Sequence, residues 1–522
     1  MPKGLPSVVA GPALSQDRAF SSPASPAPVS RRSAGRTKPG ALLALAALGL
    51  SLLTGCFALR PSNGGGQTAS LPGRTVRAAD VALPRGYRLE VVATGFTFPT
   101  AVAFDEAGRA YVLEAGYSYG EVFTIPRLLR LEQDGSRHEV ARGEHAPWNG
   151  LDYAGGAFYI AQGGEVGGGR IIKVTPDGQI TPLVQNLPSL GDHHTNRPVV
   201  GRDGYVYFGQ GTATNSGVVG EDNADFGWLK RHPQFHDVPC QDITLAGRNY
   251  QSGNPLAPER GPVVTGAFLP FGTPSAPGQV VPGALPCSGA ILRVPIAGGP
   301  LELVAWGLRN PFGLAWSPDG ALYVAENSYD VRGSRPVFGA GDPLWRVTPG
   351  TWYGWPDYHA GRPLTDADHF TAPGRPPPGQ LLARHPNAPP RPAALLGVHS
   401  SSNGLDFSRS ARFGYVNEAF VAQFGDLAPG VGKVSGPVGY KIVRVNVESG
   451  RVEDFAVNRG DTNGPASKIG GGGFERPLDA RFNPAGDALY IVDFGIMTTT
   501  EKGPVPRPGT GVLWRVVREG ES

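Results

Sequence analysis

Short stretches of alternating apolar and polar residues, separated by glycine-rich turns, recur along most of the chain. Each copy starts at a small residue or proline, runs to a turn, and continues into a segment ending in aromatic and aliphatic residues. A period of two is typical of strands with one buried face, and the DG-like turns predict hairpins. The six copies cover residues 99–116, 149–164, 197–212, 310–328, 403–425 and 476–495.

A second pattern, an arginine or lysine among aliphatic residues, follows each copy. Two hairpin-forming patterns per repeat give about four strands, and six such units arranged radially form a propeller. We therefore predict an all-β, six-bladed β-propeller over residues 84–522, in which residues 87–96 close the ring as an outer strand of the last blade. The second patterns lie at residues 127–135, 169–178, 289–299, 343–350, 440–450 and 511–520.

The spacing of the repeats breaks once, between the third and the fourth copy, where residues 213–288 are inserted. We expect this long loop, rich in Gly, Pro and Asn, to lie between the third and fourth blades and to form a lid or rim over one face of the ring. It contains Cys240 and Cys287. In an oxidising compartment this pair predicts a disulfide, and two separate thiols are the alternative.

The beginning of the chain has the organisation of an export signal. Basic residues precede an apolar run over residues 41–53, which is too short for a comfortable membrane span. The following LTGC resembles a lipoprotein cleavage box with Cys56 as the lipid attachment point; an ordinary signal peptide with an incidental cysteine is the alternative. We expect a signal over residues 1–56, a flexible tether over 57–83, and a cell-envelope lipoprotein, periplasmic or outer-surface, that contacts the membrane only through its lipid.

The charge distribution argues against nucleic-acid binding. The formal net charge of +3 comes from the first 55 residues, which hold six basic residues and one acidic residue; the rest of the chain carries −2. No basic stripe is therefore available for a phosphate backbone, and we expect no nucleic-acid partner.

Polar residues on the loops between strands are the candidates for chemistry, because the loops of all blades meet at the mouth of a propeller's channel. His193 and His194 precede the third repeat, and histidine transfers protons near neutral pH or binds metals. Arg309 lies at the start of the fourth repeat. Its rigid, planar guanidinium can donate hydrogen bonds to planar anions or carbonyl oxygens. Tyr353 and Trp355 flank a glycine and predict a platform for a flat ring or a sugar face. Structural hydrogen bonding or packing is the alternative for each cluster.

Taken together, these motifs resemble the soluble glucose/sorbosone dehydrogenases that depend on pyrroloquinoline quinone (PQQ). The order is a His-x-x-x-Arg loop, then GLRNPFGLAWSPDG, then a strand ending in an acidic segment, then WYGWPDY, and the resemblance covers most of residues 84–518. The variant pattern is more similar to the sorbosone-dehydrogenase-like branch of the family.

The resemblance implies PQQ and calcium in the channel mouth. His193 is implied to be the general base that takes the proton of a substrate hydroxyl, and Arg309 to polarise the quinone oxygen. The remaining implied contacts are Asn310, Tyr353, Trp355 and Arg476 for PQQ, and the backbone carbonyls of Ser328 and Tyr329 for calcium.

Two positions depart from the family's pattern. The aspartate that supports the histidine in better-known glucose enzymes is Thr212 here, so either Asp192 or Asp222 substitutes for it or the base is weaker. A cofactor-binding lysine in the fifth blade has no clear match. The residues near its place are Gln423 and Asp426, with Lys441 as the candidate replacement.

The sequence thus predicts an oxidoreductase that oxidises an aldose or a sugar aldehyde by hydride transfer to PQQ, with an electron acceptor that the sequence does not name. One alternative is a non-catalytic propeller that binds a ligand or a protein. Another is a lactonase-type hydrolase. The hydrolase would need a metal held by Glu326, Asn327, Asn403 and Asp493. The dehydrogenase requires that His193 and Arg309 face one cavity.

Overall fold

The computed structural model describes residues 73–519, except 165–166 and 226. This part is built from six antiparallel sheets of four strands, one of which gains a fifth short strand, so the predicted six-bladed propeller is confirmed. Within the described range, no helix has both the length and the apolar character needed to cross a bilayer. The predicted signal, Cys56 and the first part of the tether lie outside the described residues.

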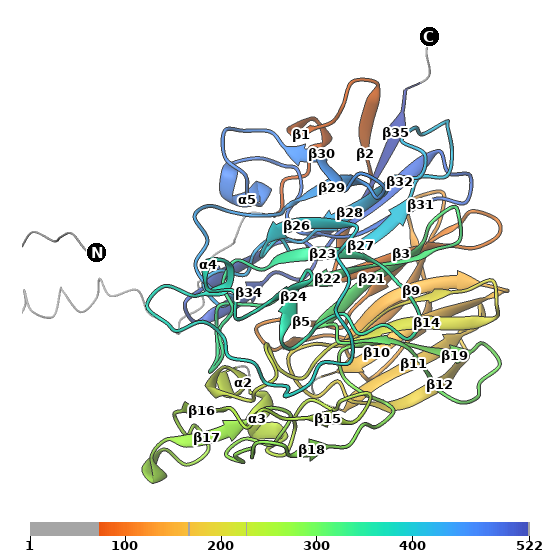
Figure 1. The fold of residues 1–522 in the computed structure, drawn as a ribbon. Coiled ribbons are helices and arrows are strands. Elements are labelled where there is room, and N and C mark those ends of the chain that lie inside the picture. The colour runs from red at the N-terminus through yellow and green to blue at the C-terminus, as the bar shows by residue number, and fades with distance from the viewer. Residues whose placement is uncertain (1–72, 165–166, 226, 520–522) are drawn as a thin grey trace, which may run out of the picture. The chain divides into compact units, whose positions relative to one another are not determined.

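Each of the first five blades runs from its innermost to its outermost strand in chain order (Figure 1). Their strands are β3 (Pro99–Phe104), β4 (Ala110–Glu114), β7 (Arg127–Leu131) and β8 (Arg137–Arg142); β9 (Trp148–Ala154), β10 (Ala157–Gly164), β11 (Gly168–Val174) and β12 (Ile180–Leu187); β13 (Thr195–Val200), β14 (Tyr205–Gln210), β19 (Ala290–Pro295) and β20 (Glu302–Trp306); β21 (Asn310–Trp316), β22 (Leu322–Asn327), β23 (Gly341–Arg346) and β26 (Ala394–Val398); and β27 (Ser402–Phe407), β28 (Ala419–Gln423), β29 (Lys441–Asn446) and β30 (Arg451–Asn458).

The sixth blade combines both ends of the propeller. Its strands β31 (Pro477–Phe482), β32 (Ala488–Asp493) and β35 (Gly511–Arg518) are completed by β2 (Tyr87–Phe96), which pairs antiparallel with β35. This closure confirms the role expected for residues 87–96. Shorter elements decorate the blades: η1 (Ala78–Asp80), β1 (Val81–Ala82), β5 (Tyr117–Ser118), β6 (Val122–Phe123), β24 (Tyr358–His359), β25 (Arg362–Pro363), α4 (Ala367–Phe370), α5 (Ala466–Ile469), β33 (Met497–Thr500) and β34 (Gly503–Pro506).

The structured part begins earlier than the sequence suggested. Strand β1 lies inside the expected tether, but it pairs with β30 at the edge of the fifth blade. Arg74 donates to the carbonyl of Thr510 (2.7 Å) and pairs with the buried carboxylate of Asp493. The last ten or so residues of the expected tether are therefore part of the fold, because their hydrogen bonds are made to the blades.

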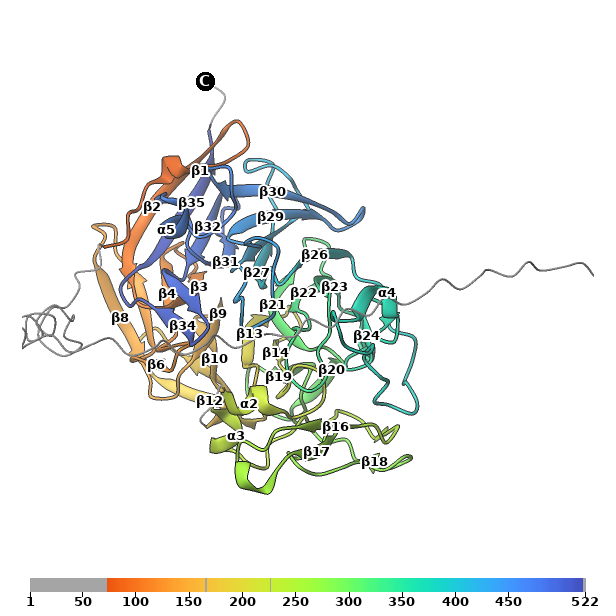
Figure 2. The same cartoon turned by 90° about the vertical axis from the view of Figure 1, so that its left-hand side faces the viewer.

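The innermost strands β3, β9, β13, β21, β27 and β31 surround the centre of the ring, each in contact with the next (Figure 2). Glycine permits this close approach. A Cβ added to Gly150 on β9 would lie 2.4 Å from Cα of Arg197 on β13, and one added to Gly404 on β27 would lie 2.7 Å from Cα of Asp479 on β31. Between the blades, buried aromatic and aliphatic side chains such as Trp148 and Phe158 form the core.

Buried ion pairs cross the channel between blades. Arg197 of the third blade pairs with Asp479 of the sixth, which lies opposite, and also donates to the carbonyl of Leu405 (3.4 Å). Arg481 of the sixth blade pairs with Asp152 of the second, whose other oxygen accepts from the Val200 amide (2.8 Å). These contacts tie distant blades together below the channel mouth.

The inserted segment lies inside the third blade and not between the third and fourth blades. Its flanking strands β14 and β19 pair from Tyr205–Pro295 to Gln210–Ala290, so the blade is completed only after the insertion. The disulfide between Cys240 and Cys287 holds the segment with a Cα–Cα distance of 5.0 Å. Its elements, at the bottom of Figure 1, are α2 (Glu221–Asp225), α3 (Trp228–Arg231), β15 (Ile243–Thr244), β16 (Asn249–Ser252), η2 (Pro258–Arg260), β17 (Val263–Gly266) and β18 (Val280–Val281).

Candidate functional site

A cavity of about 1390 Å³ lies on the face of the propeller where the innermost strands begin. The first or second residue of five of these strands reaches it: Thr100, Asn149, Asn310, Asn403 and Leu478. The insertion forms part of its wall, as expected of a rim element, through Glu221, Asp222, Asp225, Trp228, Gln251, Ser252, Gly253 and Pro262.

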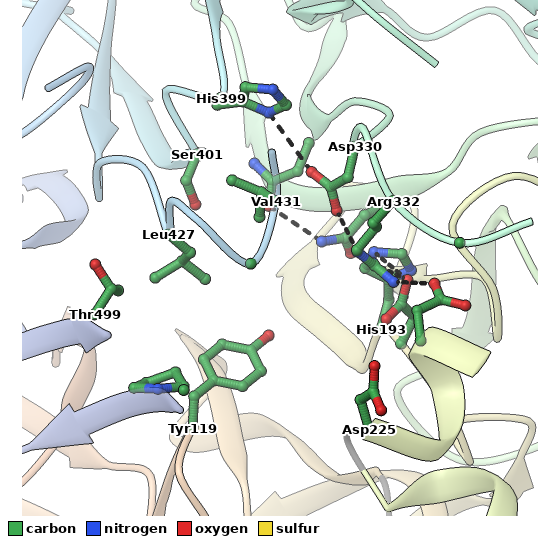
Figure 3. A pocket seen from close by; sticks show the side chains of 18 of the residues that line it. Tyr119, His193, Asp225, Asp330, Arg332, His399, Ser401, Leu427, Val431 and Thr499 are labelled. Atoms are coloured by element: carbon green, nitrogen blue, oxygen red, sulfur yellow. Dashed lines mark hydrogen bonds and ion pairs between the residues drawn. The ribbon is translucent and has the colours of Figure 1, made fainter. Parts of the chain in front are cut away.

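The cavity brings together four of the residues that the resemblance implies for catalysis, PQQ or calcium. His193, Arg309, Asn310 and Ser328 all line it. The requirement that His193 and Arg309 face one cavity is therefore met. In Figure 3, His193 lies with Asp330 and Arg332 on one side of the cavity, and Tyr119 and Leu427 lie across from them.

The hydrogen bonds of His193 define its tautomer. Its Nδ1 lies 2.9 Å from the carbonyl oxygen of Thr212, which can only accept, and 3.1 Å from the Thr212 hydroxyl, which donates to the Thr214 carbonyl (2.7 Å). Nδ1 therefore carries the proton and Nε2 keeps a lone pair. Burial, with the nearby Arg309 and Arg332, holds the pKa of His193 well below its usual value, so the ring is neutral at pH 7. The backbone carbonyl of Thr212 thus orients the ring.

A buried cluster of charges lies beside this histidine. Arg332 pairs with Asp192, with Asp222 (2.6 Å) and with Asp330 (3.1 Å), and Asp192 comes within 3.9 Å of His193 Nε2. Burial opposes ionisation of Asp330, but Arg309 and Arg332 outweigh it and keep its pKa below the usual range. Arg332 has no role in the sequence-based prediction; its position in the acidic segment after β22 was the available signal.

The guanidinium of Arg309 is fixed on three sides. It donates to the backbone and side-chain oxygens of Asn215 (3.0 Å each), to the carbonyl of Asn327 (3.2 Å) and to Asp330 (2.8 Å). Asn215, at the start of the insertion, was not predicted. Because all these partners are buried or partly buried, the orientation of the positive charge is set before any ligand binds.

A chain of amide hydrogen bonds crosses four blades at the cavity. It places Asn310 in a continuous network. The donors and acceptors run from Asn149 to Asn196 (2.9 Å), Asn196 to Asn310 (2.7 Å), Asn310 to Asn327 (3.1 Å) and Asn327 to the Ser402 carbonyl (2.8 Å). Next to this chain, the buried Oδ1 of Asn403 has no hydrogen-bond partner among the described residues.

The opposite part of the cavity is apolar. The side chains of Phe312, Phe424, Leu427, Leu478 and Phe494 line it. Phe494 is held by edge contact with Phe424, with ring centroids 5.5 Å apart. An apolar wall facing a charged wall suits a flat ligand with polar groups on its edge.

Two aromatic residues expected near a cofactor are packing residues instead. The hydroxyl of Tyr353 accepts from the Thr348 amide (2.8 Å) and donates to the Arg346 carbonyl (2.9 Å), so its polar group is satisfied within the blade. Trp355 packs edge-on against Phe268, with centroids 5.5 Å apart. Neither side chain lines the cavity, because both fill the core.

Three further expected ligands also lie away from the cavity. Lys441 pairs with Asp454 on the neighbouring strand (2.6 Å). Arg476 is buried and donates to the carbonyls of Gly425, Asp426 (3.2 Å each) and Met497 (3.1 Å), so it secures the loop after β28. The expected calcium ligand at Tyr329 was its backbone carbonyl, but Tyr329 is not among the residues that line the cavity, and its side chain donates to the Tyr358 carbonyl (3.0 Å) within the core.

The residues proposed for a hydrolase do not converge. Asn327 and Asn403 line the cavity, but Glu326 accepts from the Arg309 amide and the Trp345 indole, and Asp493 pairs with Arg74. Over the described ranges, no three His, Cys, Asp or Glu side chains gather in a metal-binding arrangement.

Comparison with solved structures finds the same fold in several enzymes. A family AA12 carbohydrate-active enzyme of Trichoderma reesei is 16% identical, with a TM-score of 0.51 over 86% of this chain and 100% of that one. The PQQ domain of pyranose dehydrogenase from Coprinopsis cinerea is 15% identical, with a TM-score of 0.50 over 86% and 98%. A PQQ-bound aldose sugar dehydrogenase of Streptomyces coelicolor is 15% identical, with a TM-score of 0.47 over 84% and 99%. At these identities the first two similarities show the fold alone. No protein-family model and no curated protein matches the sequence.

Proposed function

We propose that the protein is a propeller oxidoreductase of sugars that oxidises the carbinol or hydrated aldehyde of an aldose or sugar aldehyde, with PQQ and calcium. The observation that carries the proposal is the meeting of a neutral His193, whose Nε2 lone pair has no hydrogen-bond donor among the described residues, and a fixed Arg309 in one cavity at the channel mouth. The sequence motifs around these residues support it. So does the fold, which is shared with a solved PQQ domain of a pyranose dehydrogenase.

The residues present fit the two implied groups. PQQ is a flat ring system with carboxylates on its edge, and the apolar wall suits the ring. Arg309 and Asn310 would hold the quinone end, and the exposed cations Arg375 and Lys502 of the cavity lining would meet the carboxylates. The unpaired Oδ1 of Asn403 is a buried oxygen of the kind that calcium binds, together with the Ser328 carbonyl at the same cavity. Tyr353, Trp355, Lys441, Arg476 and Tyr329 would take no direct part.

The chain's own residues perform the proton transfer and orient the reactants. When bound, PQQ supplies the two-electron oxidant that accepts the hydride. Nε2 of His193 takes the proton of the substrate hydroxyl, while the Thr212 carbonyl keeps the Nδ1 proton in place. Asp192, 3.9 Å from Nε2, then stabilises the imidazolium. The fixed charge of Arg309 stabilises negative charge as it develops on the oxidant. The insertion forms part of the wall of this cavity.

Loading the full chain with PQQ and calcium, and following dye reduction over a panel of aldoses and sugar aldehydes, tests the proposal. His193→Gln should lower kcat by about 100-fold or more, because general-base catalysis is lost. His194→Gln is the matched control, since both histidines are 7% exposed and line the cavity. Equal loss in both variants, or no loss in His193→Gln, would contradict the role of the base. Absence of PQQ binding at micromolar concentration would favour a non-catalytic binding propeller.

We also propose that the protein is an envelope lipoprotein attached through Cys56. The proposal is supported by the apolar run and the LTGC sequence. Mass spectrometry of the N-terminal peptide from cells should find a lipid-modified cysteine. An unmodified peptide that starts elsewhere would contradict it.

A further inference from the structure

The insertion reaches the candidate base through one arginine. Asp222 on helix α2 accepts from Nη1 of Arg332 (2.6 Å), and Nη2 of the same guanidinium pairs with Asp192. Asp192 is in turn 3.9 Å from Nε2 of His193. Three segments that are far apart in sequence, the loop before β13, the insertion and the loop after β22, therefore meet at one side chain (Figure 3).

We propose that Asp222 is a positioning residue, which through Arg332 holds Asp192 beside Nε2 of His193. Through this contact, the insertion contributes to the strength of His193 as a base. This inference rests on the proposed function of His193. It differs from direct support of the imidazole, because Asp222 contacts Arg332 and the Nδ1 side of the ring is already occupied by Thr212.

The contact between Asp222 and Arg332 is closely packed. Its side chain and that of Arg332 are each 11% exposed, and that of Asp192 is 2% exposed. The chain turns away directly after Arg332 at Gly333, which has a φ of +75°. A Cβ at Gly333 would lie 2.8 Å from the Asp222 carboxylate, so only glycine lets the two segments approach this closely.

The balance of charge explains why this contact matters for a base. His193 is faced by Asp192 from its own loop, by Arg309 from the start of the fourth blade, and by Asp330 and Arg332 from the loop after β22. With Asp222 the cluster holds three carboxylates and two guanidiniums, and His399 approaches it at Asp330 (3.6 Å). One negative charge is left uncompensated, and the imidazolium formed by proton transfer would neutralise it.

Removing the charge of Asp222 should therefore weaken His193 as a base while leaving substrate binding in the cavity nearly unchanged. In Asp222→Asn the ion pair between Arg332 and residue 222 is lost, so the positive field of Arg332 at His193 is less compensated. We expect kcat to fall about tenfold with KM changed by less than about twofold, and the acidic limb of the pH profile to move to lower pH. Asp222→Glu should recover most of the loss, because it restores the charge.

The test uses the full chain in two states. In the apoprotein with ¹⁵N-labelled histidine, the Nε2 resonance of His193, assigned with His193→Gln, is compared among the wild type, Asp222→Asn, Asp222→Glu and Asp242→Asn. Asp242 lies in the same insertion outside the cavity, where it accepts from the Gly283 amide (2.8 Å), so it is the matched control. In the PQQ-loaded protein, the pH dependence of kcat is measured for the same set.

A shift of the Nε2 resonance in Asp222→Asn, absent in Asp242→Asn and reversed in Asp222→Glu, supports the inference whether or not the protein oxidises a sugar. Coincident Nε2 resonances in the wild type and Asp222→Asn overturn it, as do equal changes in Asp222→Asn and Asp242→Asn. If the resonance shifts but neither the wild type nor any variant turns over, the proposed dehydrogenase activity is wrong. The inference that Asp222 positions Asp192 is then still supported.

Discussion

Removal of Arg197 should destabilise the propeller more than a typical core substitution. The side chains of Arg197 and Asp479 are each 2% exposed, and the pair joins opposite blades across the channel. Without Arg197, Asp479 keeps the Val102 amide (3.2 Å) as a donor but has no partner charge of its own. Breaking a buried pair by removing one partner costs about 3–5 kcal/mol. We expect Arg197→Met to reach the upper part of this range, because Asp152 and Asp406 then share Arg481 with Asp479.

Equilibrium urea unfolding followed by tryptophan fluorescence measures this effect. The double variant Arg197→Met/Asp479→Leu should regain most of the lost free energy of unfolding, because no unpaired charge remains in the channel. Arg260→Met is the control. Arg260 is 80% exposed and lies 3.8 Å from Glu259, so its loss should change the free energy of unfolding by less than about 0.5 kcal/mol. A cost below about 1 kcal/mol for Arg197→Met, or a double variant no more stable than the single one, would refute the reasoning.

Two further predictions concern the site. A Cβ at Gly211 would lie 2.2 Å from Cβ of His193, so Gly211→Ala should displace the base and lower kcat by about 100-fold, whereas Gly436→Ala, with nothing within 4 Å, should not; equal kcat values would contradict this placement. Burial raises the pKa of Asp237 to about 7. Its folded pKa thus exceeds the unfolded value, so its contribution is complete below about pH 4 and is lost as the pH rises through 7. Relative to the wild type, Asp237→Asn should therefore gain free energy of unfolding, on the order of a few kcal/mol, between pH 4 and 8 in urea titrations; a constant difference would contradict the shift.

The blades were predictable from sequence because the alternation of buried and exposed positions is a local property of each strand. The same pattern identified β2 as the strand that closes the ring. The place of the insertion was harder to predict. The pattern over residues 289–299 was recognised, but its pairing with β14 is a long-range contact that local alternation does not specify.

The candidate site was predictable only in part, because it depends on which loops converge. His193 and Arg309 stood out through their chemistry and their positions before strands. Arg332 and Asn215 did not, since their roles arise from partners 94 to 140 residues away. Aromatic and cationic residues on loops look the same in sequence whether they bind a ligand or fill the core. Tyr353 is the clearest example, because its hydroxyl is satisfied inside its own blade.

Rapid mixing of the PQQ- and calcium-loaded full chain with excess aldose or sugar aldehyde, without oxygen, tests the central claim most directly. The absorbance of the bound cofactor reports its reduction in a single turnover. We expect one reduced cofactor per protein with at least one of these substrates, and much slower reduction in His193→Gln. A cofactor that binds but stays oxidised with every sugar, or that is reduced equally fast without His193, would contradict it.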